Sequence, residues 1–331
     1  MLVETPANSD RPLDVLTFGE TMLRLSAPHF GRLEEAVSLD VRVGGSESNT
    51  AVALARLGLK TAWFSRLPNN PLGRRIENEI RRWGVDTSRM IWDETPDSRA
   101  GLYFLDFGVA PRGIDVYYDR KDSAIAKIAL IEIGLDTIAQ ARLLQLSGIT
   151  SALSPQCAEA NRAMIHTAKK AQTAVSFDVN YRAKLWTPQE ARAELETLLP
   201  MVDVLLCPQS DAELIFGITG DGVTVAKEMR ARYGVATAVI TCGGDGAIAC
   251  DDRGDCAAKP FALTQIVDRV GAGDAFNAGV LMGWLEGDLA KGLIYGTAMA
   301  ALKHTISGDL LLSTRAEIER AVMGGSGGIR R

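Results

Sequence analysis

Short apolar segments alternate with longer amphipathic segments along most of the chain. Uninterrupted apolar runs that stop at a polar residue or a glycine predict strands at 14–18, 60–67, 174–180, 202–208 and 236–244. Apolar positions that recur at helical spacing predict helices at 47–58, 71–83 and 155–171. Strands that alternate with helices in this way form a mostly parallel sheet with helices on both faces. The pattern therefore predicts an α/β protein.

One region departs from this alternation. Residues 99–119 read as two strands joined by a Gly/Pro loop, with no helix between them, and residues 39–45 read as a third extended piece. We therefore expect a small sheet, with strands inserted at about 37–46 and 99–122, that stands apart from the main sheet. Its aromatic side chains, which we expect to be exposed, suit a lid or a dimer face; they are Tyr103, Tyr117 and Tyr118. An ordinary edge hairpin explains the local pattern equally well.

The sequence predicts one domain over 13–322, with flexible tails at 1–12 and 323–331. Polar residues and glycines directly follow several of the apolar runs; they are Asp178, Asn180, Gly243, Gly244 and Asp268. Parallel sheets bind their ligands at the carboxyl ends of the strands. We therefore expect the binding site at that edge of the sheet.

The charge of the chain limits the partners that it can bind. It has 331 residues, with 36 Lys and Arg against 41 Asp and Glu, and a formal net charge of −5. Such a chain lacks the basic surface with which proteins bind nucleic acid or anionic membranes. It has no run of the ~18 apolar residues that span a bilayer, and its first residues lack the basic and apolar regions of a signal peptide. We therefore expect no nucleic-acid or membrane partner.

The cysteines indicate a reducing compartment. Their number is five, which is odd, and no pair has the C-x-x-C spacing. This argues against a disulfide framework or a zinc site and favours the cytoplasm. The three histidines are too scattered along the chain to predict a metal site built from histidine.

The stretch VDRVGAGDAFNAG, residues 267–279, contains the clearest candidate chemistry. A strand-like run ends at Asp268, and two glycines and Asp274 then stand where a helix is predicted to begin. The first amides of a helix have no partner within it and carry partial positive charge, and glycines let a ligand approach them closely. These amides can hold phosphate oxygens, and Asp274 can accept a proton from an attacking hydroxyl. A capping aspartate after a glycine-rich turn explains this stretch equally well.

Two other glycine-rich phosphate-binding motifs fit the chain poorly. In G-x-G-x-x-G, Phe276 stands where the third glycine belongs, and the ribose-binding acid of a Rossmann dehydrogenase is missing at the expected distance. A Walker A loop requires a Gly-Lys pair, which the sequence does not contain. These observations argue against a dinucleotide-binding dehydrogenase and exclude a P-loop kinase.

Two widely separated stretches resemble the signatures of the PfkB (ribokinase-like) carbohydrate kinases. VGGSESNTAVALARLGLKTAWFSRLPNNPLGRRI is similar to their N-terminal signature and DRVGAGDAFNAGVL to their C-terminal one. FGETMLRL, VYYDRKDSA, FDVNYRAKLW and AALKHTISGD resemble 2-keto-3-deoxygluconate kinases in particular. The resemblance covers residues 13–322 and implies a ribokinase-like three-layer α/β/α fold with a mostly parallel central sheet and a small protruding β-sheet lid.

The resemblance also implies a reaction. It is the ATP-dependent phosphorylation of a sugar hydroxyl, with 2-dehydro-3-deoxy-D-gluconate converted to its 6-phosphate in the presence of Mg²⁺. Whether a monovalent cation is also required stays open. Kinases of neutral sugars, such as fructose or ribose, and a sugar- or nucleotide-binding protein without activity are the alternatives. The resemblance further implies a homodimer or higher homo-oligomer that forms through the lid.

Individual residues take expected roles from the resemblance. Asp274 is the expected base, and the amides of Gly271, Ala272 and Gly273 the expected anion hole. The expected sugar contacts are Gly44, Gly45, Asn49, Tyr103, Tyr118, Arg120, Arg182 and Asp309. The expected nucleotide contacts are Asn180, Ser210, Thr241, Gly243, Gly246 and Lys303, and Glu213 is expected to organise Mg²⁺.

The chain departs from the family pattern at three places. Many members have Asn-x-x-Glu where this chain has Ser210-Asp211-Ala212-Glu213, so that Glu213 keeps the acid while Ser210 lacks the amide. Val270 replaces a common threonine before the glycine turn. Gly244 replaces a common lysine, which removes a cation near the expected nucleotide.

An acidic substrate requires cationic partners in the site, and two arginines are candidates. A keto acid carries a carboxylate, and burying a carboxylate without a partner costs several kcal/mol. Arg120 and Arg182 are the expected partners of this carboxylate, through charge-assisted hydrogen bonds. From the sequence alone, surface residues are the favoured interpretation of both arginines, and the resemblance to the family reverses this preference.

Overall fold

The computed structural model describes residues 10–108 and 111–324. The predicted flexible tails, 1–12 and 323–331, therefore lie largely outside the described residues. At the start of the described chain, the Arg11 guanidinium donates hydrogen bonds to the carbonyl oxygens of Ala141 at 2.6 Å and Ala171 at 2.8 Å. Residues 10–12 are thus tied to the amino-terminal end of a sheet strand.

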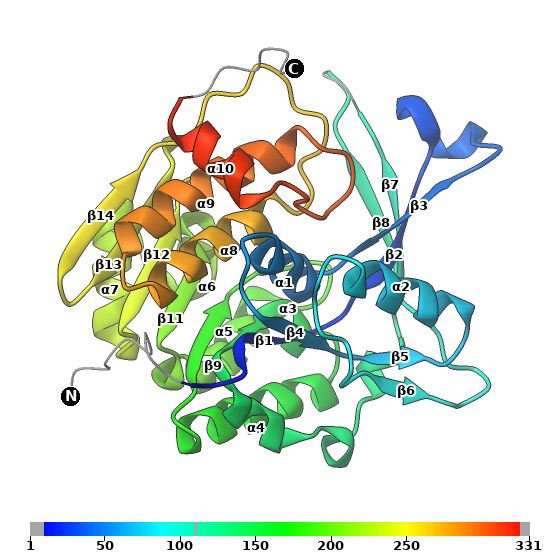
Figure 1. Ribbon diagram of the computed structural model, residues 1–331, viewed down its shortest axis with the longest axis horizontal. Coiled ribbons are helices and arrows are strands. Elements are labelled where there is room, and N and C mark those ends of the chain that lie inside the picture. Colours follow the sequence, from blue (N-terminus) through cyan, green and yellow to red (C-terminus); the bar gives the residue numbers. More distant parts are fainter. Residues whose placement is uncertain (1–9, 109–110, 325–331) are drawn as a thin grey trace.

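An eight-stranded sheet forms the centre of the molecule (Figure 1). Its strands, in spatial order, are β14 (Gly254–Ala258), β13 (Ala247–Asp251), β12 (Thr237–Thr241), β11 (Val204–Pro208), β10 (Ala174–Asp178), β9 (Ala141–Ser147), β1 (Leu13–Phe18) and β4 (Thr61–Phe64). The pairs from β12 to β4 are parallel, and β13 and β14 add an antiparallel edge. The predicted mostly parallel sheet is confirmed.

Helices cover both faces of this sheet, as the alternating pattern predicted (Figure 1). One face packs against α4 (Pro155–Lys170), α5 (Pro188–Leu198), α6 (Gln209–Phe216) and α7 (Gly222–Tyr233). The other packs against α1 (Ser46–Arg56), α8 (Ala272–Leu285), α9 (Leu289–His304) and α10 (Arg315–Val322). Two hydrophobic cores result, one on each side of the sheet, and the three-layer α/β/α fold is confirmed.

Shorter helical elements complete the layers. Two more α-helices are α2 (Pro71–Arg81) and α3 (Gly148–Ser151). The 3-10 helices are Pro28–Phe30, Leu33–Glu35, Ile125–Lys127, Leu130–Glu132, Leu135–Gln140, Leu199–Met201 and Gly243–Asp245. Local sequence sets several helix starts: the Asn70 side chain accepts hydrogen bonds from the amides of Leu72 and Gly73, with Pro71 in the first turn.

A separate four-stranded sheet stands off the main body, and we call it the lid sheet. Its order is β3 (Asp40–Gly44), β2 (Met22–Ser26), β7 (Leu102–Asp106) and β8 (Asp115–Asp119), with β2 and β7 parallel and the other pairs antiparallel. The expected small sheet is therefore present, and an ordinary edge hairpin does not describe it. Strand β2 was not predicted as a strand.

The expected exposure of the aromatic side chains holds for two of the three. Tyr117 is 56% exposed and Tyr118 39%, but Tyr103 is buried at 3%. Tyr103 is buried because its hydroxyl faces the main body and donates to Asp309 at 2.6 Å. Successive residues of a strand point to opposite faces, so the strand pattern alone does not show which face meets the main body.

Two predicted strands differ in the structure. The run at 60–67 divides at Ser65 into β4 and a short β5 (Arg66–Pro68), which pairs with β6 (Ile91–Asp93) in a two-stranded sheet. The run at 266–267 is not a strand. It crosses the end of helix α9, where the Val267 amide donates to the carbonyl of His304 at 2.8 Å.

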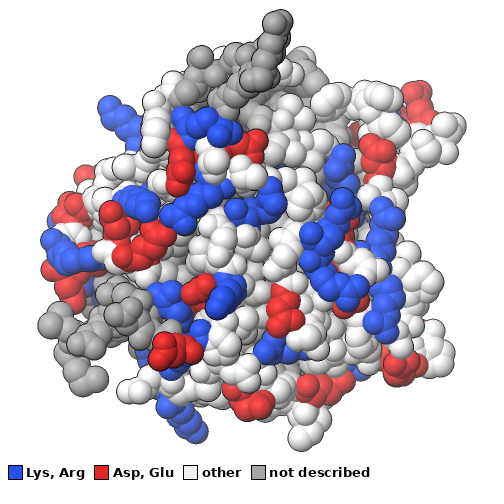
Figure 2. All heavy atoms as spheres, in the orientation of Figure 1, with Lys and Arg blue, Asp and Glu red and all other residues white. Residues whose placement is uncertain are grey.

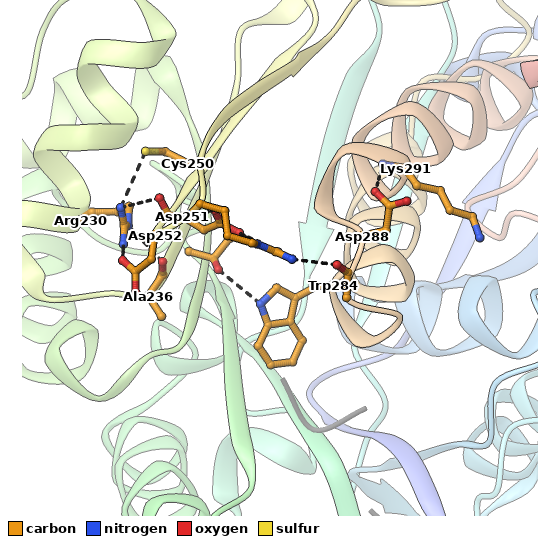
Figure 3. Close-up of polar contacts among 11 residues, drawn as sticks. Arg230, Ala236, Cys250, Asp251, Asp252, Trp284, Asp288 and Lys291 are labelled. Atoms are coloured by element: carbon orange, nitrogen blue, oxygen red, sulfur yellow. Dashed lines mark hydrogen bonds and ion pairs between the residues drawn. The ribbon is translucent and has the colours of Figure 1, made fainter. Parts of the chain in front are cut away.

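The antiparallel edge is tied to helices of both layers (Figure 3). Arg230 of α7 donates to the carbonyls of Ala236 at 3.0 Å and Asp251 at 2.9 Å (Figure 3). On the opposite side, the Trp284 indole of α8 donates to the Thr237 hydroxyl at 3.3 Å. These contacts hold β12 and β13 in place, and with them the loop that follows β12.

The surface carries charges of both signs (Figure 2). Arginines gather over α2 on the face shown, but the helix also carries acids, and Arg81 pairs with Glu77 at 3.1 Å and Arg82 with Glu79 at 3.2 Å. Among the described residues, none of the helices combines the length and the apolar character needed to cross a membrane.

Candidate active site

A cleft of about 480 Å³ lies between the lid sheet and the carboxyl ends of the main-sheet strands. Its walls bring together residues that are far apart in sequence. The predicted site residues that line it are Gly44, Gly45, Asn49, Tyr103, Tyr118, Arg120, Asn180, Arg182, Thr241, Gly271, Gly273, Asp274 and Asp309. The residues expected to bind sugar and the residue expected to act as base therefore share one cavity.

The start of helix α8 forms one end of the cleft. Gly271 precedes the helix with φ of +84°, and a Cβ there would lie 1.9 Å from the Asp309 carbonyl oxygen, so that a glycine is required. Gly273 faces open space, since a Cβ at this position would meet nothing within 4 Å. The Ala272 amide makes a long hydrogen bond of 3.4 Å to the Arg269 carbonyl. The amides of the first turn thus face the cleft beside Asp274.

Asp274 is held by the first turn of α1. The Ser46 hydroxyl donates to its Oδ1 at 2.8 Å, and the Asn49 side-chain amide donates to its Oδ2 at 2.7 Å. Burial raises the pKa of Asp274 above its ordinary value, and these two hydrogen bonds oppose the rise. The carboxylate is therefore oriented by neutral donors and is a stronger proton acceptor than an exposed aspartate.

A second aspartate lies in the same cleft. Asp178, at the end of β10, accepts hydrogen bonds from the Asn277 side chain at 2.8 Å and from the Asn180 amide at 3.1 Å. Burial, with the charge of Asp274 adding to it, raises the pKa of Asp178 to about 7. Asn180 has φ of +42°, and its side chain donates to the Ser46 hydroxyl at 2.8 Å. A polar chain therefore links Asp178 to Asp274.

Glu47 is a further acid that the sequence reasoning missed. It is 1% exposed and accepts hydrogen bonds from the hydroxyls of Ser147 at 2.5 Å and Thr150 at 2.6 Å. Burial raises its pKa to about 7. Its place inside the N-terminal signature stretch, two residues before Asn49, was the available signal.

The lid sheet supplies aromatic and charged groups at the other end of the cleft. Arg120 is 8% exposed, and its Nε donates to Glu20 at 2.7 Å. Its guanidinium also lies 5.5 Å from the centre of the Tyr118 ring, which in turn packs 6.0 Å from the Tyr103 ring. Arg120 is therefore a buried residue of the site, and Glu20, which was not predicted, holds it in place.

Arg182 stands at the open side of the cleft. It is exposed, and its guanidinium donates to the Tyr181 carbonyl at 2.9 Å. None of the carboxylates in the described part of the chain forms an ion pair with it. Arg269, which the sequence reasoning did not single out, also lines the cleft. Both cations are placed to meet an anionic ligand.

Two predicted residues of α6 lie outside the cleft. Ser210 and Glu213 are exposed and do not line it, whereas Asp211 does. Residues two positions apart on a helix point about 200° apart, so Glu213 and Asp211 cannot face the same cavity. Burial raises the pKa of Asp211. Asp211 is therefore the acid of this segment that lines the cleft, and the expected role of Glu213 in organising Mg²⁺ stays a prediction.

Three of the expected nucleotide contacts also do not line the cleft. Gly243 and Gly246 lie in the loop after Thr241, and a Cβ on Gly246 would approach the Ala258 carbonyl oxygen to 2.1 Å. Lys303 is fully buried in α9, where its ammonium donates to the Ile306 carbonyl at 3.0 Å. Burial lowers the pKa of Lys303. The helix directs this lysine into the protein and away from the cleft.

Comparisons with known proteins give a consistent relationship. The family described as "pfkB family carbohydrate kinase" matches residues 13–313. The 2-dehydro-3-deoxygalactonokinase of Haloferax volcanii is 43% identical over 319 residues, which cover 96% of this chain and 99% of that protein. The 2-dehydro-3-deoxygluconokinase of Bacillus subtilis is 32% identical over 303 residues, covering 90% and 91%.

A solved structure is similar over nearly the whole chain. The crystal structure of 2-dehydro-3-deoxygluconokinase from Thermotoga maritima superimposes with a TM-score of 0.89 at 34% identity. The match covers 94% of this chain and 98% of that one.

We predict that Asp178 makes the stability of the protein depend on pH. Its pKa is about 7 when folded and near 3.8 ordinarily, so between these values the folded state keeps a proton that the unfolded chain releases. Stability from this group is therefore lost as pH rises toward 7. In Asp178→Asn, the free energy of unfolding relative to wild type should be higher at pH 8 than at pH 5 by roughly 2–3 kcal/mol.

Urea unfolding at the two pH values measures this difference. Asp97→Asn, a substitution at an exposed aspartate, serves as the matched control and should show no such change. An Asp178→Asn effect that is the same at both pH values would contradict the prediction.

Proposed function

The chain belongs to the pfkB family of carbohydrate kinases, and from this premise we propose that its acceptor is a 2-keto-3-deoxy sugar acid. The motifs predicted 2-dehydro-3-deoxy-D-gluconate, which would give the 6-phosphate, and the relative at 43% identity is named for the galactonate. These two acids are epimers that share the keto-carboxylate end. The proposal therefore covers both epimers.

The observation that carries this proposal is the pair of arginines that line the cleft, Arg120 and Arg182. Arg120 is buried beside Tyr118, and its Nε and one terminal nitrogen bind Glu20. Arg182 has no ion-pair partner among the described carboxylates. A carboxylate bound between them would form charge-assisted hydrogen bonds that a neutral sugar lacks.

The other end of the cleft supports phosphoryl transfer. Asp274 faces the cavity, where its carboxylate would accept the proton of the attacking sugar hydroxyl. Ser46 and Asn49 would keep this carboxylate oriented, and the first-turn amides near Gly273 would hold the oxygens of the transferred group. Lys184, in the main-body segment between β10 and α5, donates to the carbonyl of Val116 in the lid strand β8 at 2.7 Å and links the lid sheet to the main body, which helps to exclude water.

The donors in the cleft fit magnesium that is carried in with a nucleotide. No group of three or more acidic, histidine or cysteine side chains in the described ranges forms a metal cage. Mg²⁺ commonly binds through phosphates and water with one or two carboxylates, and Asp211 is a carboxylate placed for this role. When bound, the ion would neutralise charge on the phosphates. Arg269 would add a cation where Gly244 replaces the common lysine.

A substrate panel tests the proposed acceptor. ADP release should be measured with both 2-keto-3-deoxy acids, fructose and ribose, with Asp274→Asn as the inactive control that still binds ATP. We expect kcat/KM for one or both acids to exceed that for the neutral sugars by about 100-fold or more, because Arg182 would be left without an anionic partner when a neutral ligand is bound. Turnover of fructose or ribose in preference to the acids would refute the proposal. Activity in Asp274→Asn would mean that another group is the base.

The two acids of α6 give a second test. In Asp211→Asn, the Mg²⁺ concentration for half-maximal activity should rise roughly tenfold, as for other groups that support a metal. Glu213→Gln, the control, should leave it unchanged because this side chain is exposed outside the cleft. The reverse result would return the metal role to Glu213.

We also propose that two chains pair through the lid sheet. Apolar side chains are exposed in this region: Val37, Leu39, Val41, Tyr117 and Tyr118. In sedimentation velocity, Val41→Glu should shift the protein from dimer to monomer. Leu214→Glu, at an equally apolar exposed position on α6, should not. A wild-type monomer at micromolar concentration would contradict this proposal.

A further inference from the structure

An arginine of the lid sheet reaches into the main body without lining the cleft. Arg24 lies in the middle of β2 and is fully buried. Its two terminal nitrogens bind different carboxylates, that of Asp309 at 2.6 Å and that of Asp268 at 2.6 Å. The ring of Phe107 lies 5.0 Å from the guanidinium carbon. One side chain of the lid therefore bridges two acids of the main body.

Asp268 connects this bridge to the turn before helix α8. Its Oδ1 accepts from the Val270 amide at 3.1 Å, and its Oδ2 accepts from the Gly308 amide at 2.9 Å. Gly271, the residue after Val270, begins the helix end that faces the cleft. The Asp268 carboxylate thus fixes the position of the turn that leads into the first turn of α8.

Asp309 connects the bridge to Tyr103 and Gly44, which are expected sugar contacts, and to the same turn before α8. Its Oδ2 accepts from the Tyr103 hydroxyl at 2.6 Å. A Cβ on Gly44 would lie 2.2 Å from that oxygen, and a Cβ on Gly271 would lie 1.9 Å from the Asp309 carbonyl oxygen. Packing this close leaves no room for Asp309 to shift without moving the strand β3 or the helix end.

Because its charges are buried, this bridge depends on the shape of the Arg24 guanidinium. Burial acts to lower the pKa of Arg24, but the two carboxylates outweigh it and the pKa is raised. Burial raises the pKa of Asp309, and Arg24 opposes this rise. Lys303, which is also buried nearby, donates to a carbonyl and forms no ion pair with either acid. The guanidinium therefore supplies the direct compensation for both acids.

We infer that Arg24 is a positioning residue for phosphoryl transfer. It locks the lid sheet to Asp309 and to the turn that follows Asp268, so that the start of α8 and the segment of Asp309 keep one arrangement. This inference rests on the proposed kinase function. The fork of a guanidinium places two nitrogens on two carboxylates at once, whereas a lysine ammonium is a single point charge. A lysine at this position would therefore keep the positive charge but not the two simultaneous contacts.

Arg24→Lys separates geometry from charge. It keeps the positive charge, so that the two buried carboxylates are not left without compensation as they would be in Arg24→Met. Arg42→Lys is the matched control, because Arg42 stands directly opposite Arg24 in the β2–β3 register but is exposed. Two readouts are measured on both variants: hydrogen–deuterium exchange of the amides of residues 269–276, and kcat with the KM for ATP and for the acid.

We expect Arg24→Lys to fold, to exchange the amides of 269–276 at least about tenfold faster, and to lose about 100-fold in kcat, as expected when reacting groups are misplaced by about 1 Å. The KM for ATP should stay within about threefold, and Arg42→Lys should match wild type in every readout. If Arg24→Lys fails to fold, the pair Arg24→Gln with Asp268→Asn, which removes one ion pair of the bridge and keeps its net charge, is measured instead with the same expectation.

Each outcome decides the inference. Unchanged exchange at 269–276, or faster exchange with full kcat, overturns the positioning role. If wild type turns over none of the sugar acids while Arg24→Lys still exchanges faster, the proposed acceptor fails and the structural lock by Arg24 stands. Equal effects in Arg24→Lys and Arg42→Lys overturn the role of Arg24, because they would reflect a general loosening of the lid sheet.

Discussion

The close contact between Gly271 and the Asp309 carbonyl is the constraint on which the site depends. A glycine with positive φ is needed there, because any side chain would enter the backbone of the facing segment. This contact brings the amides of α8 to the edge of the cleft and places Asp274 beside them in the first turn of the helix. The segment of Asp309, an expected sugar contact, and the start of α8, the expected anion hole, are therefore parts of one packed unit.

The cleft gathers acids and compensates for them mainly with neutral donors. Asp274, Asp178 and Glu47 accept from hydroxyls, side-chain amides and one backbone amide, and burial raises the pKa of each. Such a cavity repels a bare polyphosphate unless cations accompany it. This electrostatic demand agrees with a nucleotide that arrives with magnesium.

The lid sheet contributes to this arrangement in two ways. Tyr118 and Arg120 face the cavity, while Arg24 points to the main body and meets its carboxylates. Since β2 and β7 lie side by side in parallel, the contacts of Arg24 and Tyr103 with Asp309 come from adjacent strands of one sheet. The lid is thus fastened to the carboxylate of Asp309, which is an expected sugar contact.

The sequence by itself determined the α/β class, the strands and helices with the clearest periodicity, and the glycine turn with Asp274, because each of these is recorded in local periodicity and in residue types of one short stretch. The split at Ser65, the strand β2 and the burial of Tyr103 depend on which neighbour a segment meets, which no local pattern contains.

Which acid of α6, Asp211 or Glu213, lines the cleft was likewise decided by the tertiary structure. Both acids stand on the same short helix, and the side of α6 that faces the cleft is set by its packing on the sheet. The partners of Arg24 lie 244 and 285 residues away along the chain. Local sequence specifies what each residue is able to do, and the packing of distant segments specifies which residues meet.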